Sequence, residues 1–155
     1  MRSMSRTVRI ALAMSLLWLS ACASGRDTSH HETAVKATLE AFYGAMKTGD
    51  TAMAMAQIAP DAMFVETGKL ETREQYEKNH LPLDIGFEKQ ITGKRTPWRV
   101  TIKDDTAWVI ASTTYTGPVD GDDVNFVSSQ LAVLTNEMDG WRIRSIHWSS
   151  RPNLD

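Results

Sequence analysis

Two carboxylates and two histidines stand at places in the sequence where a fold could gather them. Glu66 ends an apolar segment, His80 and Asp84 follow shortly after it, and His147 lies near the C-terminus. A carboxylate held in a poorly solvated pocket has a raised pKa and can transfer a proton on a bound substrate. The first chemistry that we expect is therefore acid/base catalysis with Glu66 as the general base.

The same side chains would also suit a divalent metal ion. Two imidazoles and a carboxylate are ligands of zinc, copper or iron, and their chemistry does not choose among the three. The expected ligands are Glu66, His80 and His147, with Glu71 or Asp84 as a further donor. These residues are far apart in sequence, so only the fold can bring them together.

A third alternative is binding of a small molecule without chemistry. Aromatic side chains recur along the C-terminal half, and most of them must be core. Those that face a cavity would suit a flat apolar ligand. The expected ligand-binding residues are Tyr43, Phe64, His80, Trp98, Tyr115 and His147.

The elements before residue 84 are mainly helical by pattern. Apolar residues at spacings of three and four predict a helix from Thr33 to about Lys47. A shorter helix is expected over Thr51–Ile58, followed by a strand over Asp61–Glu66. A capping-box pattern predicts a helix over Arg73–Asn79 that stops before Pro82, which would prevent His80 and Asp84 from sharing a helical face.

The remainder of the chain has the pattern of strands joined by short turns. Five strands are expected, and in the last of them alternation would place Trp141, Ile143 and His147 on one face. Their ranges are 84–93, 98–103, 106–116, 125–136 and 141–149. Helices first and strands afterwards indicate an α+β fold, in which a curved antiparallel sheet wraps around the N-terminal helices.

Two segments resemble a known family. Ala41–Ala52 is similar to the first helix and helix joint of the SnoaL-like branch of the nuclear transport factor 2-like superfamily, and Asp139–Ser149 is similar to its final strand. The resemblance covers Glu32–Ser150 and implies a cone-like fold with an open, partly apolar cavity. Members of that superfamily include isomerases, cyclases, dehydratases, binding modules and dimerisation domains, so the fold leaves the function open.

The resemblance also implies where a site would lie. In the superfamily, the first strand, the segment after the third helix and the concave sheet face line the cavity, and Glu66, His80, Asp84 and His147 match those places. His147 or Tyr43 would then polarise a substrate carbonyl, as in ketosteroid isomerase relatives. The same relatives imply a homodimer formed through the outer face of the sheet.

The N-terminal segment predicts export and lipid anchoring. Arg2, Arg6 and Arg9 precede a short apolar run that ends in Leu-Ser-Ala before Cys22, which resembles a lipobox. We therefore expect a signal peptide over 1–21 and lipidation of Cys22, the only cysteine, with Ala23 favouring the periplasmic face of the outer membrane.

The predicted division of the chain follows from that segment. A flexible tether over 22–31 would precede one SnoaL-like domain over 32–150 and a tail over 151–155. Removal of 1–21 takes 3 of the 17 basic residues and none of the 19 acidic ones, which leaves 14 − 19 = −5. That charge argues against a nucleic-acid partner. The expected partners are a membrane through the lipid, a small molecule and a second copy.

Overall fold

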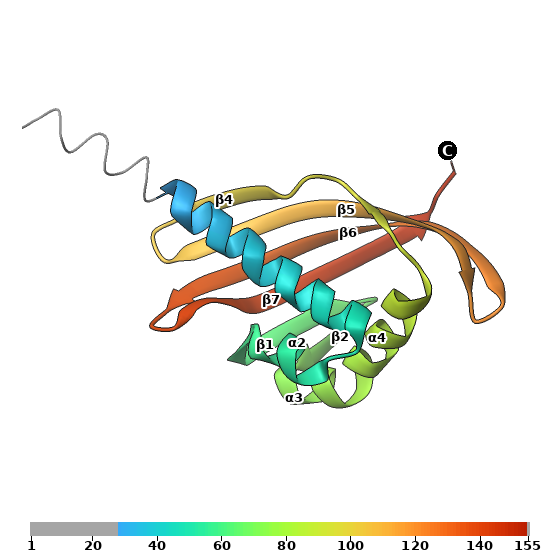
Figure 1. Cartoon of the computed structure of the whole chain (residues 1–155), viewed down its shortest axis with the longest axis horizontal. Coiled ribbons are helices and arrows are strands. Elements are labelled where there is room, and N and C mark those ends of the chain that lie inside the picture. Colours follow the sequence, from blue (N-terminus) through green and yellow to red (C-terminus); the bar gives the residue numbers. More distant parts are fainter. Residues whose placement is uncertain (1–27, 155) are drawn as a thin grey trace, which may run out of the picture.

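The computed structural model describes residues 28–154, which form a curved seven-stranded sheet with helices packed on its concave face (Figure 1). A long helix over residues 28–48 lies across the sheet, and the short helices gather near its C-terminal end (Figure 1). The predicted α+β class is confirmed. No helix among the described residues is long and apolar enough to cross a membrane. Residues 1–27, with the predicted signal and Cys22, lie outside the described part.

The long helix is amphipathic, as the apolar spacing predicts. Val35, Leu39, Phe42 and Met46 are at most 2 % exposed and form the stripe that faces the sheet. The helix already includes residues 28–31, which the sequence assigns to the tether. There the Trp141 Nε1 donates to His31 Nδ1 at 3.2 Å, so the first turn is packed on the last strand.

The second helix is shorter than predicted. Helix α2 (Thr51–Ala56) is capped by the Asp50 side chain, which accepts from the backbone N–H of Met53. Strand β1 (Ile58–Glu66) begins almost at once and includes Pro60, which lies where the register with its neighbour shifts. A proline is tolerated at such an irregularity because the missing N–H breaks no ladder bond there.

The segment after β1 departs most from the sequence prediction. Strand β2 (Lys69–Thr72) pairs with β1, and the predicted capping box of Thr72 and Gln75 opens α3 (Arg73–Gln75). A π-helical turn, η1 (Tyr76–His80), then leads directly into α4 (Leu81–Gln90).

The predicted strand over 84–93 is therefore wrong, because most of that range belongs to a helix. Pro82 does not end the preceding helical segment but stands in the first turn of α4. A proline is tolerated at that point because its missing N–H would have no intrahelical partner there.

The remaining strands complete the sheet, and the last three are longer than predicted. They are β3 (Lys94–Arg95), β4 (Arg99–Lys103), β5 (Thr106–Val119), β6 (Asp122–Glu137) and β7 (Gly140–Pro152). The order is β2-β1-β7-β6-β5-β3, with β4 also on β5. Because β1 pairs parallel to β7, the sheet is mixed rather than wholly antiparallel.

A bulge in β7 reverses the predicted facing of its second half. Ile143 pairs with Leu134, but Ser145 pairs with Val133, so β7 holds one extra residue there. Beyond the bulge Ile146 is buried and His147 is exposed. The predicted common face of Trp141, Ile143 and His147 is therefore wrong for His147.

Candidate functional site

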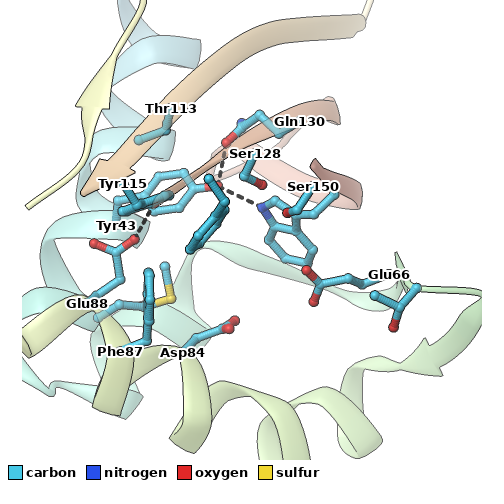
Figure 2. Close-up of a pocket in the computed structure, with 14 residues that line it drawn as sticks. Tyr43, Glu66, Asp84, Phe87, Glu88, Thr113, Tyr115, Ser128, Gln130 and Ser150 are labelled. Atoms are coloured by element: carbon cyan, nitrogen blue, oxygen red, sulfur yellow. Dashed lines mark hydrogen bonds between the residues drawn. The ribbon is translucent and has the colours of Figure 1, made fainter. Parts of the chain in front are cut away.

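A cavity of about 400 Å³ opens between the C-terminal end of the long helix, α4 and the concave face of β5, β6 and β7 (Figure 2). Aromatic side chains and carboxylates dominate its lining. The lining residues are Tyr43, Met46, Glu66, Thr67, Asp84, Phe87, Glu88, Thr113, Tyr115, Phe126, Ser128, Gln130, Trp148 and Ser150. A cavity of this size accommodates a small organic molecule.

One wall of the cavity carries a chain of ion pairs centred on His80. The His80 Nδ1 lies 2.6 Å from Glu71 Oε2, and its Nε2 lies 2.9 Å from Glu66 Oε2 and 3.5 Å from Asp84 Oδ1. Hydrogen bonding to Glu66, assisted by the charges of Asp84 and Glu66 and by Glu71, raises the pKa of His80 to about 9. His80 is therefore a cation at neutral pH.

Asp84 is the carboxylate of this wall whose pKa is shifted by burial. Burial raises the pKa of Asp84 to about 6, and the neighbouring Glu66 and Glu88 add to that rise. His80 and the hydroxyl of Tyr76, which donates to Asp84 Oδ2 at 2.7 Å, oppose it. A carboxylate with a pKa of about 6 can accept and return a proton near neutral pH.

The π-helical turn makes this arrangement possible. Tyr76 and His80 are the first and last residues of η1, and α4 continues from it without a break. His80 and Asp84 consequently lie one turn apart and in contact, although Pro82 stands between them. The prediction that Pro82 separates the two side chains is wrong. π-helical turns are frequent at functional sites.

The facing wall is made of neutral hydrogen-bonding groups. The Tyr43 hydroxyl donates to Gln130 Oε1 at 2.5 Å and accepts from Trp148 Nε1 at 3.2 Å. Burial raises the pKa of Tyr43 well above its ordinary range, so the hydroxyl stays protonated. The Gln130 Nε2 is buried and has no partner among the described residues.

An aromatic cluster forms the outer part of the cavity. The rings of Phe87, Tyr115 and Phe126 contact one another, with centroid distances of 5.0, 5.2 and 5.9 Å. The Tyr115 hydroxyl donates to Glu88 Oε1 at 2.8 Å, as Figure 2 shows. Burial, followed by the charge of Glu88, raises the pKa of Tyr115 well above its ordinary range.

A second hollow of about 240 Å³ lies beside the cavity and shares Tyr43, Glu88, Thr113 and Tyr115 with it. Arg95 lines this hollow, with its guanidinium 4.1 Å from the ring centroid of Tyr43 and 4.6 Å from that of Trp98. Arg95 does not line the larger cavity.

The structure brings together part of the predicted site. Glu66, Tyr43 and Tyr115 line the cavity, and His80 lies directly behind Glu66 and Asp84. Phe64 is instead in the core, 1 % exposed and stacked on Tyr76 at 3.9 Å. Trp98 stacks on Tyr43 at 6.0 Å but does not line the cavity.

The structure does not bring His147 to Glu66 and His80. Glu66 is paired with Trp148, which lines the cavity, while His147 is paired with Val65 and is exposed on the opposite face of the sheet. The predicted set of Glu66, His80 and His147 is therefore not assembled. No group of three or more potential ligands within residues 28–154 is placed to hold a metal ion.

Several lining residues are not predicted from the sequence. Phe87 and Glu88 fall in the range predicted as a strand, whereas in α4 Glu88 lies one helical turn after Asp84. Gln130 and Trp148 are directly paired in β6 and β7, but the bulge in β7 conceals this pairing in the sequence. The apolar residues Leu81 and Ile85, four positions apart and both buried, are the available signal for α4.

Solved structures with the same architecture include a candidate ketosteroid isomerase from Shewanella frigidimarina. It is 25 % identical, with a TM-score of 0.71 over 75 % of this chain and 94 % of that one. A candidate dehydratase of the NTF2-like family from Streptomyces avermitilis is 21 % identical, with a TM-score of 0.67 over 82 % and 99 %.

A third neighbour is an NTF2-like protein with a cystatin-like fold from Novosphingobium aromaticivorans. It is 14 % identical and has a TM-score of 0.68 over 84 % of this chain and 88 % of that one. A search of curated proteins finds no match. The SnoaL-like domain model matches residues 35–152. The cavity thus lies in a chain that belongs to the SnoaL-like domain family.

Proposed function

We propose that the cavity binds a small, mainly apolar molecule and that Asp84 transfers a proton on it. One observation carries this proposal: Asp84 lines an aromatic cavity and has a pKa of about 6. The general base is thus Asp84 and not Glu66, whose carboxylate is bonded to His80 at 2.9 Å. The candidate isomerase and candidate dehydratase among the structural neighbours are consistent with this class of reaction.

In this proposal one wall of the cavity supplies the base and the facing wall supplies a hydrogen-bond donor. Asp84 would take a proton from the carbon next to a substrate carbonyl, and the electron pair would move to the carbonyl oxygen. The neutral hydroxyl of Tyr43, on the facing wall, would turn its hydrogen from Gln130 Oε1 to that oxygen. In an isomerisation, Asp84 would return the proton to another carbon of the conjugated enolate as the carbonyl re-forms. In an elimination, the enolate would expel a hydroxyl group from the β-carbon as the double bond forms, and that group would take the proton from Asp84 and leave as water.

Hydrogen–deuterium exchange of β-tetralone tests the proposal. This enolisable ketone has an apolar body and exchanges its α-hydrogens in D₂O, which NMR follows directly. We expect the protein to accelerate the exchange over buffer and Asp84→Asn to lose about a hundredfold or more of that acceleration. Binding of β-tetralone, measured by calorimetry, should persist in the variant because the cavity walls are unchanged.

The outcomes separate catalysis from binding. Exposed Glu74 provides a matched control, since Glu74→Gln removes a carboxylate outside the cavity. Binding of β-tetralone without any acceleration by the wild type would leave a binding module and overturn the assignment of Asp84. Equal rates for wild type and Asp84→Asn would do the same.

We further propose that the domain is anchored to the cell envelope, on the periplasmic face of the outer membrane, through a lipid on Cys22. The support is the sequence before Cys22, with three arginines, a short apolar run and small residues at the end. Labelling with a radioactive fatty acid should mark the wild type and not Cys22→Ala. Release of Cys22→Ala into the soluble periplasmic fraction is expected as well, and equal membrane association would contradict the proposal.

We also propose that two copies pair through the outer face of the sheet. Trp108, Ile110 and Leu131 are exposed there by 37–47 %, and Ile110 and Leu131 are direct neighbours in β5 and β6. Exposed apolar side chains that lie together favour an interface. Light scattering should give a dimer for the wild type and a monomer for Leu131→Lys.

A further inference from the structure

The lining of the large cavity combines aromatic rings with acidic groups. Five of its side chains are aromatic: Tyr43, Phe87, Tyr115, Phe126 and Trp148. Three are carboxylic acids: Glu66, Asp84 and Glu88. The face of an aromatic ring is electronegative and attracts a cation, so both kinds of lining group favour the same sign of charge in a ligand.

No lysine, arginine or histidine lines this cavity in the part of the chain that the structure describes. His80 lies behind the wall and supplies one positive charge against Glu66, Glu71 and Asp84, all within 3.5 Å of its ring nitrogens. Arg95 packs against Tyr43 and lines the neighbouring hollow instead. With its carboxylates ionised, the wall therefore keeps a net negative charge.

Three aromatic rings and a carboxylate gather in the outer part of the cavity. Phe87 stands against Tyr115 at an interplanar angle of 70°, and Phe126 lies within 5.9 Å of both rings. Glu88 is fixed beside them by the 2.8 Å hydrogen bond from Tyr115. A ring face that borders the cavity attracts an ammonium group, and an adjacent carboxylate adds to that attraction.

A separate observation concerns an unpaired donor in the cavity wall. The Gln130 side chain is 7 % exposed and lines the cavity, and its Nε2 has no acceptor among the described residues. A buried donor without a partner is costly, and a ligand oxygen is one way to satisfy it after a small rotation of the amide. The ligand would then carry an acceptor as well as a charge.

We infer that the ligand is an organic cation, a protonated amine or a quaternary ammonium compound, whose charged group lies against Phe87, Tyr115, Phe126 and Glu88. Its body extends toward Asp84 and Gln130. This inference rests on the proposed function of the cavity and names the class of its substrate. The acidic and aromatic lining selects this class over a neutral molecule of the same shape.

Three probes that share one ring system test the inference. They share a naphthalene body and differ in charge: naphthylmethyl-trimethylammonium is a cation, naphthylmethanol is neutral and naphthylacetate is an anion. Binding is measured by calorimetry at about pH 8, where carboxyl groups are ionised. We expect the cation to bind about tenfold more tightly than the alcohol, and the anion to bind most weakly.

Glu88→Gln isolates the charge, because a glutamine at this position still accepts from the Tyr115 hydroxyl. The cation should lose most of its advantage in this variant, while the alcohol binds as before. Exposed Glu74→Gln is the control and should leave the affinities of all three probes unchanged.

The results distinguish this inference from the proposed function. Equal binding of cation and alcohol, or preference for the anion, would overturn the cation inference while the cavity still binds small molecules. Failure of all three probes and of β-tetralone to bind would instead remove the proposed function. A cation preference that persists in Glu88→Gln would show that Glu88 does not set it.

Discussion

The two walls of the cavity handle buried polarity in opposite ways. The wall from β1, β2, η1 and α4 gathers ionisable groups, with His80 between Glu71, Glu66 and Asp84. The wall from the long helix, β6 and β7 uses neutral groups, with Tyr43 between Gln130 and Trp148. Both walls are desolvated, yet only the first can change its protonation state near neutral pH.

The difference shows how one cavity can hold both a base and a donor. Desolvation raises the pKa of Asp84 into the range where a carboxylate exchanges protons, because His80 and Tyr76 keep it from rising further. The same desolvation raises the pKa of Tyr43 far above neutral pH, although the Trp148 N–H and the nearby Arg95 guanidinium oppose the rise. Burial therefore allows Asp84 to exchange a proton near neutral pH and prevents Tyr43 from doing so.

The largest effect is expected where the walls meet. Phe64 is 1 % exposed and stacks on Tyr76 at 3.9 Å and on Trp148 at 6.0 Å, so it joins the two walls. Phe64→Ala should lower the free energy of unfolding in urea by about 3–5 kcal/mol. Leu83→Ala, at a position 70 % exposed, is the control and should change it by less than about 0.5 kcal/mol.

Removing a donor from the charged wall should move its titration. Tyr76→Phe keeps the ring but loses the hydrogen bond to Asp84, which stabilises the ionised carboxylate by about 1.5–3 kcal/mol. The pKa of Asp84 should rise above about 6, so the pH at which β-tetralone exchange reaches half its maximum should rise too. Tyr115→Phe, whose hydroxyl bonds Glu88, should leave that midpoint in place.

The pH dependence of stability tests the histidine of the same wall. His80 has a pKa of about 9 in the folded protein against 6.5 ordinarily, so its contribution is full below pH 6.5 and is lost as pH rises through about 9. Glu71→Gln should reduce this loss of stability at high pH, because the protonated imidazole of His80 then has one carboxylate partner fewer. Urea unfolding at a series of pH values measures how the free energy of unfolding changes with pH. The same pH dependence in wild type and Glu71→Gln would contradict the role of Glu71.

The smallest effect is expected on the neutral wall. Tyr43→Phe removes the donor proposed for a substrate carbonyl and should weaken β-tetralone binding about three- to tenfold. Ser150→Ala removes another lining hydroxyl and should have less effect. If both variants bind β-tetralone like the wild type, Tyr43 does not contact the ketone and the contrast between the walls is structural only.

Much of the fold was predictable because its signals are local. The apolar stripe from Val35 to Met46 requires only the helical period, and the capping box of Thr72 and Gln75 requires only neighbouring side chains. The strands after residue 98 follow from alternation and turns. Helix α4 was missed because Pro82 suggests a break in sequence, whereas its place in the first turn is set by η1.

The candidate site was predictable in its residue types but not in its grouping. Glu66, His80 and Asp84 meet because β1 and the η1–α4 segment lie against each other, which no spacing in the sequence shows. His147 was misplaced by the single extra residue in β7, which turns every later side chain to the other face. A bulge of this kind depends on the pairing of two strands.

By itself the sequence determined the helix-then-strand order, the amphipathic long helix, the likeness to the SnoaL-like domain family and a short set of reactive side chains. These properties arise from periods and motifs within a few residues of each other. Tertiary structure alone decided that Asp84 is the desolvated carboxylate, that Trp148 rather than His147 faces the cavity, and that aromatic rings and acids share one lining. Those outcomes depend on burial and on strand register, which exist only once distant segments have packed together.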